Sequence, residues 1–258
     1  MPQAERRRAE DVVGTSEAPA PGHEVGVGRA SEVPRVGLDH VDGVAGASAA
    51  QEYRRRHDAR RERVTGAYPR MGRLLLAVFD DPQTTQAWST GAVGEQQLGG
   101  MLATIAGPEL RVLHDRRIPG SRANIDHLVV SPTGVHVVDA KRYRNKRPDV
   151  RIEGGLLTPR RRFLTVGGRD RSDLVEGVSR QVQRVRAALE GEPDVDVHGH
   201  LCFLDADWGL LQRPFTVDGV GVAWPRRLKK ELTEPGPLGA ERIADLQWLL
   251  HQAFPRQN

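Results

Sequence analysis

Short apolar runs and helical apolar stripes alternate along the last two thirds of this 258-residue chain. Runs rich in Val, Ile and Leu that are bounded by turn residues predict strands. We expect strands at about residues 110–118, 124–131, 134–141, 156–166, 197–206 and 219–224. Apolar positions that recur three and four residues apart predict helices on a packed core. We expect these helices at about residues 91–105, 173–189 and 239–253.

The N-terminal third lacks these patterns. Residues 1–48 are rich in Ala, Gly, Pro, Val and Glu, so we expect a disordered or flexible tail. Residues 50–66 predict an Arg-rich helix with no apolar stripe, and we favour a solvated helix over an arm that faces nucleic acid. Residues 70–79 predict a short apolar helix that ends before Pro82. The expected organisation is a tail over 1–48, a helical extension over 49–89 and one domain over 90–258.

A β-hairpin gives the sharpest local prediction. The Ser-Pro-Thr-Gly sequence at Ser131–Gly134 suits a type I turn between two Val-rich strands. If Val130 faces Val135, the antiparallel register sets Asp126 opposite Asp139, with their side chains on one face. A slip of one residue in this register would separate the two carboxylates.

The same face of this hairpin carries the residues of a metal site. Lys141 follows Asp139 by two residues, so its side chain falls on that face. Two carboxylates this close repel each other unless a cation lies between them, and Mg²⁺ is a hard cation that prefers oxygen ligands. The alternative is a solvated Asp–Lys pair on an exposed strand. Asp is a poor strand former, so two of them within Val-rich strands favour the metal site.

Two of the predicted helices carry a polar residue on or beside the apolar face. Glu95 lies in the stripe of the helix at 91–105, where a carboxylate is costly to bury unless it is paired. It can instead flank the stripe and interact with the helix N-terminus. Gln181 lies between Val178 and Val185 on the stripe of the next helix. Its alternative is an edge residue whose polar end reaches solvent.

Positive charge is concentrated directly after the hairpin. The chain has a net charge of +4 and a pI near 9.6, but Lys141–Arg162 alone holds nine basic residues against two acidic ones. Lys and Arg supply phosphate contacts, and an aromatic ring can stack on a base. The alternative is an ordinary solvated charge run. The residues that we expect to bind nucleic acid are Arg142, Tyr143, Arg144, Lys146, Arg147, Arg160, Arg161 and Arg162.

The combination of these motifs resembles the nuclease-related domain (NERD) family, a branch of the PD-(D/E)xK nuclease superfamily. The resemblance covers roughly residues 90–190, less than half of the chain. It is carried by Gly91-Ala92-Val93-Gly94-Glu95, Ile125-Asp126-His127, Gly134-Val135, Asp139-Ala140-Lys141, Tyr143 and Gln181. The resemblance implies an α/β (α+β) fold with a restriction-endonuclease-like core, in which helices flank a mixed β-sheet.

The resemblance also implies roles for the site residues. Asp126, Asp139 and Glu95, with the Ala140 carbonyl, would hold Mg²⁺ or Mn²⁺. Lys141 would orient a water or stabilise the transition state, and Gln181 would position the nucleic acid, with DNA favoured. The expected activity is phosphodiester hydrolysis. A catalytically silent nucleic-acid-binding or regulatory module on the same fold is the alternative.

Other features narrow the class of protein. The single cysteine, Cys202, excludes an intrachain disulfide and fits a reducing cytosol, so we expect a cytoplasmic protein with no membrane partner. A second metal site at His198, His200, Asp205 and Asp207 is disfavoured, because Asp205 has the opposite strand parity from His198. His127 and His136 fall on the hairpin face away from the carboxylates. We expect them to be packed or hydrogen-bonded structural residues.

Overall fold

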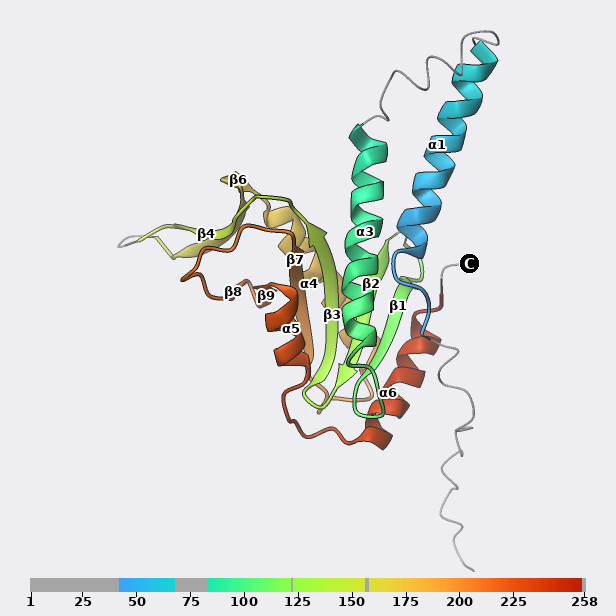
Figure 1. The fold of residues 1–258 in the computed structure, drawn as a ribbon. Coiled ribbons are helices and arrows are strands. Elements are labelled where there is room, and N and C mark those ends of the chain that lie inside the picture. The colour runs from blue at the N-terminus through green and yellow to red at the C-terminus, as the bar shows by residue number, and fades with distance from the viewer. Residues whose placement is uncertain (1–41, 68–82, 122, 156–157, 257–258) are drawn as a thin grey trace, which may run out of the picture. The chain divides into compact units, whose positions relative to one another are not determined.

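The computed structural model describes residues 42–67, 83–121, 123–155 and 158–256 (Figure 1). The described helices are α1 (Ala47–Ala67), α3 (Gln83–Ala103), α4 (Ser172–Ala188), α5 (Pro225–Leu232) and α6 (Ala240–Ala253). The described strands are β1 (Arg111–Arg117), β2 (Asn124–Ser131), β3 (Gly134–Arg142), β4 (Pro148–Glu153), β5 (Arg161–Val166), β6 (Arg169–Asp170), β7 (Val197–Leu204), β8 (Phe215–Val217) and β9 (Val220–Ala223). None of the helices in these ranges is long and apolar enough to cross a membrane.

The strands form two sheets. The larger sheet has six strands in the order β1-β2-β3-β7-β9-β8 and is mixed. Its β1–β2, β2–β3 and β8–β9 pairs are antiparallel, while β3–β7 and β7–β9 are parallel. A small antiparallel sheet has the order β4-β5-β6. The predicted α/β class with a mixed sheet flanked by helices is thus confirmed.

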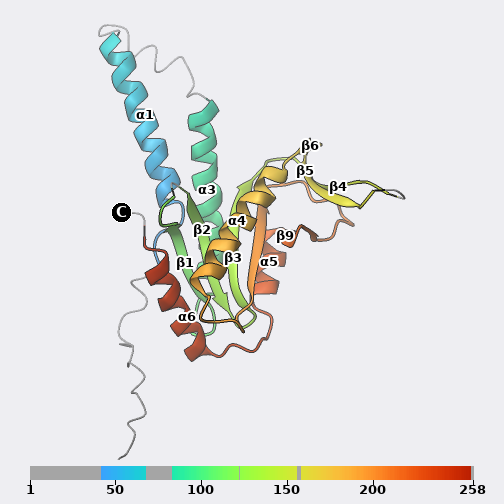
Figure 2. The ribbon, with the colours of Figure 1, turned by 180° about the vertical axis from the view of Figure 1, so that it is seen from behind.

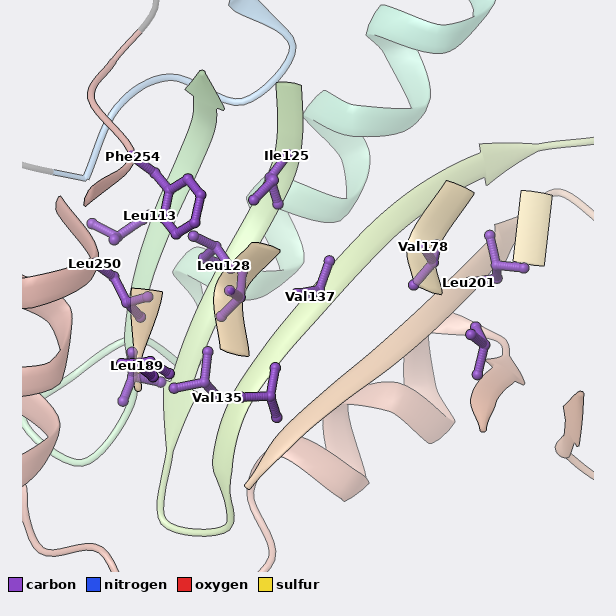
Figure 3. Packing of buried hydrophobic residues seen from close by; sticks show 14 of the residues in the cluster. Leu113, Ile125, Leu128, Val135, Val137, Val178, Leu189, Leu201, Leu250 and Phe254 are labelled. Carbon is purple, nitrogen blue, oxygen red and sulfur yellow. The ribbon is translucent and has the colours of Figure 1, made fainter. Parts of the chain in front are cut away.

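Helices cover both faces of the six-stranded sheet (Figures 1 and 2). On one face, Leu113, Leu128 and Val137 from three neighbouring strands pack with α4 and α6, and Figure 3 shows these side chains in one layer. On the other face, β2 and β3 pack against α3 and α5 through residues such as Val129 and Val138. Alternate residues of β2 and β3 therefore enter different cores, as the strand period requires. Each such buried side chain contributes about 1.5–3 kcal/mol of transfer free energy.

The elements nearest the hairpin follow the sequence prediction closely. Strand β2 has the predicted bounds, β3 extends one residue further than predicted, and α6 begins one residue later. The helix predicted to begin at Gly91 begins instead at Gln83. Pro82 directly precedes this start, and nothing between Gln83 and Gly91 breaks a helix. As a result, α3 crosses the predicted boundary between the helical extension and the domain.

Four elements were not predicted: β4, the two-residue β6, β8 and α5. Strand β4 was missed because it begins with a proline and contains three charged residues, a composition tolerated at a sheet edge. The strand predicted over 156–166 is β5, which begins at Arg161. The short strand β8 was missed, as was α5, whose Pro225 occupies the first turn and whose Leu228 and Leu232 are buried.

The N-terminal region is described in part. The polar helix predicted over 50–66 is α1, and it packs against α3. The helix predicted over 70–79 lies outside the described residues, as does most of the predicted tail. The backbone carbonyl of Asp42 accepts a hydrogen bond from the His114 amide, and its side chain accepts one from Gln247 (2.8 Å). Contacts with the core therefore begin before residue 49.

Candidate functional site

The predicted register of the β2–β3 hairpin is confirmed. Val130 pairs with Val135, and the paired residues continue to His127 opposite Val138. Asp126 and Asp139 occupy the next position, where the two strands leave regular pairing. The Ala140 amide donates a hydrogen bond to Asp126 Oδ2 (3.4 Å), so the Asp126 side chain reaches across to β3. The local turn and the alternation of apolar residues thus bring the two carboxylates together.

The two aspartates are enclosed and electrostatically strained. Loss of water around its carboxyl, followed by the negative charges of Asp139 and Glu95, raises the pKa of Asp126 well above its usual value. Asp139 is only 8% exposed, and its Oδ1 is a buried atom. This oxygen forms an ion pair with the ammonium of Lys141. Two carboxylates this close repel each other, and the Lys141 ammonium supplies the positive charge that compensates them.

Lys141 supplies the positive charge of the site. Its side chain is 26% exposed, so the ammonium lies at the border between the protein and solvent. Burial opposes its charge, but the negative charges of Asp139 and Asp126 outweigh burial and raise the pKa of Lys141. The lysine therefore remains protonated throughout the physiological range.

Glu95 approaches the same group of charges from α3. Its side chain is half-buried, and burial followed by the charge of Asp115 raises its pKa to about 7. Lys141 opposes this rise, whereas Asp139 adds to it. The predicted position of Glu95 beside the buried face of its helix agrees with this environment. Glu95, Asp126, Asp139 and Lys141 therefore influence one another electrostatically.

Asp115 is a member of this environment that the sequence analysis missed. The pairs His114–His127 and Arg116–Ile125 flank it, so β1 sets Asp115 at the level of Asp126. It is 5% exposed and has a positive φ of 52°, a backbone conformation that is uncommon outside glycine. The one signal in the sequence is an Asp inside an otherwise apolar and basic strand.

Gln181 is connected to this part of the site through β2. Its Nε2 donates to the backbone carbonyl of Asn124 (3.1 Å), and the Asn124 side chain donates to Asp115 Oδ1 (3.0 Å). Gln181 Oε1 is buried and has no hydrogen-bond partner among the residues that the structure describes. The residue predicted to contact nucleic acid therefore holds the start of the strand that carries Asp126.

The donors available for a metal are carboxylate oxygens. Within the described ranges, no group of three His, Cys, Asp or Glu side chains is arranged to hold a metal ion. Asp126 and Asp139 are the two carboxylates that the hairpin places together, with Glu95 close enough to affect the pKa of Asp126. This oxygen-rich, nitrogen-free set suits Mg²⁺ or Mn²⁺ and is unlike a zinc site.

The basic stretch divides into paired and unpaired residues. Arg142 and Arg144 form ion pairs with Asp205, at 2.8 and 3.8 Å, and Arg147 forms one with Asp207 at 3.2 Å. The remaining predicted cations are exposed, and in the described part of the chain they form no ion pair: Lys146, Arg160, Arg161 and Arg162. Arg151 of this stretch lies on β4, and Arg161 and Arg162 lie on β5.

Tyr143 has an environment different from the one expected. The ring packs against Phe203, with a centroid distance of 5.7 Å, and the Arg171 guanidinium lies over it at 5.3 Å. Arg171 also donates a hydrogen bond to the Tyr143 hydroxyl. These contacts occupy much of the ring that was predicted to stack on a base.

The histidines of the hairpin lie on the opposite face, as predicted. His127 is fully buried and forms a hydrogen bond with His114 through their Nδ1 atoms (2.8 Å). His136 forms hydrogen bonds with Ser131 Oγ (3.0 Å), Thr133 Oγ1 (3.1 Å) and His200 Nε2 (3.0 Å). These residues are packed and hydrogen-bonded, so they have a structural role.

A pocket of about 390 Å³ lies elsewhere. It is lined by Ile105, Pro108, Pro132 and Leu232, among others. Pro132 belongs to the β2–β3 turn, so this pocket lies at the end of the hairpin away from Asp126 and Asp139. It does not contribute to the carboxylate site.

Comparison with known proteins agrees with the resemblance noted in the sequence. No curated protein and no solved structure matches the chain. Residues 90–204 match the family model described as NERD, nuclease-related domain. The match contains Glu95, Asp126, Asp139, Lys141 and Gln181. It begins within α3 and ends with the last residue of β7. Residues 90–204 of this chain are therefore a nuclease-related domain.

Proposed function

We propose that this protein is a metal-dependent nuclease that hydrolyses phosphodiester bonds, with DNA as the favoured substrate. The proposal includes a restriction-endonuclease-like core formed by the mixed sheet and its flanking helices. One observation carries it: the hairpin register brings Asp126 and Asp139 together beside the Lys141 ammonium. The nuclease-related domain match supports the same reaction class.

The donor set fits a divalent cation. Asp126 and Asp139 would hold it, with the Ala140 carbonyl and Glu95 as the further ligands implied by the family resemblance. The hairpin register that sets Asp126 level with Asp139 supports this assignment, since two adjacent carboxylates are suitable ligands for a divalent cation. The raised pKa of Asp126 supports it too, because the paired carboxylates favour a bound positive charge. A bound Mg²⁺ or Mn²⁺ supplies Lewis acidity that polarises a phosphoryl oxygen and lowers the pKa of its water.

The chain's own residues position the reactants and balance charge. Lys141 carries a permanent positive charge at the protein–solvent border, where it can stabilise the extra negative charge of a pentavalent phosphorus. Glu95, with a pKa of about 7, can accept a proton from a water near neutral pH. Gln181 holds the Asn124 carbonyl and so fixes the start of β2.

Nucleic acid would approach along the basic segment that follows Lys141. The exposed and unpaired Lys146, Arg160, Arg161 and Arg162 are the best candidates for phosphate contacts. Arg142, Arg144 and Arg147 are held by Asp205 and Asp207, and phosphate would have to compete for them. Removing an unpaired arginine should therefore weaken binding more than removing a paired one.

The alternative is a catalytically silent module that binds nucleic acid on the same fold. A silent module has no need of two carboxylates that repel each other, whereas a metal site does. Calorimetry separates the two. Uptake of Mn²⁺ that Asp126→Asn abolishes favours the nuclease, whereas binding of DNA without any metal uptake favours the silent module.

Plasmid cleavage in Mg²⁺ or Mn²⁺ tests the activity directly. We expect Lys141→Ala to lower the cleavage rate about 10²–10³-fold, and Asp139→Ala to lower it at least as much. The matched control is Asp149→Ala, because Asp149 is an exposed aspartate on β4 whose loss leaves the carboxylate pair intact. Equal cleavage by all four proteins would contradict the assignment.

A further inference from the structure

Two adjacent leucines project from the loop between β7 and β8. Leu210 is 105% exposed and Leu211 is 95% exposed, the largest values among the exposed large hydrophobic residues of the described chain. They form the centre of a tight turn, which the Gln212 amide closes by donating to the Gly209 carbonyl (2.9 Å). Single exposed apolar residues are normal on protein surfaces. Two neighbouring leucines at the tip of one turn require a more specific account.

The turn is held firmly from within the protein. The Gln212 side chain accepts a hydrogen bond from the Gly209 amide (3.2 Å) and donates one to the Pro148 carbonyl. The Trp208 ring packs edge-to-face with Trp224, at a centroid distance of 5.0 Å, and tilted against Phe215 at 6.4 Å. The leucines are therefore displayed on a fixed support, and binding through them costs little ordering entropy.

This support is joined to the strand of the carboxylate site. Backbone hydrogen bonds run from Tyr143 to Leu204 (3.2 Å), from Asn145 to Asp205 (3.1 Å) and from Asp207 to Lys146 (3.1 Å). The segment that leaves Lys141 and the segment that leads to Leu210 thus run side by side. The segment that leads to the leucine turn is therefore anchored to the segment that follows Lys141.

Positive charge surrounds the turn. Arg144, Lys146 and Arg147 are exposed on the neighbouring segment, and Arg213 is exposed directly after the turn. The Arg147 guanidinium lies beside Gly209, where a Cβ atom would come within 3.6 Å of it. Asp205 and Asp207 neutralise part of this charge, but the basic residues outnumber them. The turn therefore presents an apolar tip with a cationic rim.

This chemistry fits a nucleic-acid duplex. Apolar side chains such as Leu insert between base steps and unstack them, while neighbouring Arg and Lys contact the phosphates. A stable protein interface needs a much larger contiguous apolar patch than two side chains provide. We propose that Leu210 and Leu211 form a wedge that enters a DNA duplex beside the carboxylate site. This proposal rests on the proposed nuclease function and specifies a double-stranded substrate.

Fluorescence of 2-aminopurine placed inside a DNA duplex tests the wedge, since unstacking this base raises its emission. The full chain is used with Asp139→Asn in every protein, so that the duplex stays intact. We expect a severalfold rise on binding. Adding Leu210→Ser and Leu211→Ser should abolish the rise and weaken affinity about tenfold, an amount typical of one lost stacking contact. Both leucines are fully exposed, so these substitutions leave the fold unaffected.

Ile152→Ser is the matched control, because Ile152 is an exposed apolar residue of β4 (60%) outside the turn. It should keep both the fluorescence rise and the affinity. An unchanged rise and affinity in the double-leucine variant would overturn the wedge. If the double-leucine variant keeps its duplex binding but loses binding to anionic phosphatidylserine vesicles, the wedge is overturned, and the leucines contact a lipid surface instead.

The failure of the wedge and the failure of the nuclease function give different results. If the wild-type chain cleaves plasmid and the Asp139→Asn chain binds the duplex without a fluorescence change, only the wedge is wrong. If cleavage is absent and no duplex binds, both proposals are wrong. If Asp139→Ala and Lys141→Ala cleave like the wild type, the site is wrong, and the fluorescence assay still decides the wedge by itself.

Discussion

Two polar clusters lie on opposite faces of the same sheet and differ in how they are satisfied. The carboxylate cluster, Asp126, Asp139 and Lys141, sits at one end of the β2–β3 hairpin. The histidine cluster, His136, His198 and His200, lies on the other face, where His136 stacks on His198 and His200 at centroid distances of 4.9 and 5.2 Å. His136 forms hydrogen bonds with His200 and with the hydroxyls of Ser131 and Thr133. In the carboxylate cluster, the charges of Asp126 and Asp139 repel each other, and the Lys141 ammonium forms an ion pair with Asp139.

The difference shows what a buried polar group indicates. Burial lowers the pKa of His136 well below its ordinary value and that of His200 to about 4, so both remain neutral and need no counter-ion. Burial raises the pKa of Asp126, and the charge of Asp139 raises it further. A neutral hydrogen-bonded network stabilises the core, whereas closely spaced charges that shift one another's pKa are retained where function requires them.

The largest expected effect is a contrast in stability between His136→Ala and Asp139→Asn in metal-free protein. His136→Ala removes the hydrogen-bond partner of the buried His200 and one of the partners of Ser131, and it creates a cavity, so the free energy of unfolding should fall by about 2–4 kcal/mol. Asp139→Asn removes the charge that repels Asp126 but also the ion pair with Lys141, so the two effects offset each other and stability should change little. Urea unfolding in EDTA measures both. Equal losses in the two variants would remove the distinction between the clusters.

The pH dependence of the free energy of unfolding should give the second largest contrast between the two clusters. The pKa of Glu95 is raised to about 7, so its stabilising contribution is complete below its unfolded value near 4.5 and is lost as the pH rises through 7. Glu95→Gln should therefore gain about 1–3 kcal/mol over the wild type between pH 5 and pH 8.5 in EDTA. A difference in the free energy of unfolding that stays constant over this pH range would show that the pKa of Glu95 is not raised in the folded protein.

Acidification acts on the histidines with the opposite sign. The pKa of His200 is lowered to about 4, so its contribution is complete above 6.5 and is lost as the pH falls toward 4. Protonation of Glu95 stabilises the wild type as the pH falls, and Glu95→Gln lacks this contribution. The stability of Glu95→Gln should therefore fall more steeply over this acidic range than that of the wild type. Unfolding curves at half-unit pH intervals resolve the two slopes.

A smaller effect comes from divalent cations. At tenfold excess over the dissociation constant, Mg²⁺ bound to the folded state stabilises it by about 1.4 kcal/mol, which corresponds to a rise in Tm of about 3–5 °C. We expect this increment in the wild type and its loss in Asp126→Asn. The control is His198→Ala, which alters the histidine cluster and should keep the whole increment. An increment that survives in Asp126→Asn would place the cation elsewhere.

The sequence was sufficient for the features that depend on local chemistry. The Ser131–Gly134 turn and the alternation of Val residues determined the bounds of β2 and the register that sets Asp126 level with Asp139. Both signals lie within a few residues of the site. The same alternation assigned His127 and His136 to the opposite face.

Features that depend on distant packing were not accessible in this way. Asp115 lies in a strand with basic neighbours, and its effect on Glu95 depends on how α3 crosses the sheet. Strand β4 is charged because its small sheet is largely exposed, so it lacks the apolar alternation of a buried strand. The hydrogen bond between Gln181 and Asn124 joins residues 57 positions apart. Only the fold places such residues together.

The smallest expected effect concerns Gln181, and it decides between contact with nucleic acid and positioning of β2. Its Nε2 already donates to the Asn124 carbonyl, while its buried Oε1 has no partner in the described part of the chain. Gln181→Met keeps the volume but removes the donor, so stability should fall by about 0.5–1.5 kcal/mol. If Gln181 acts by fixing the strand that carries Asp126, kcat should fall about tenfold with KM nearly unchanged, because only the reacting geometry is disturbed. If Gln181 binds the substrate directly, KM should rise while kcat stays the same.

Asn124→Ala serves as the comparison, since it removes the side-chain link to Asp115 but keeps the carbonyl that Gln181 binds. A kcat loss in Gln181→Met that exceeds the loss in Asn124→Ala would locate the effect in the backbone of β2, whereas equal losses would locate it in Asp115.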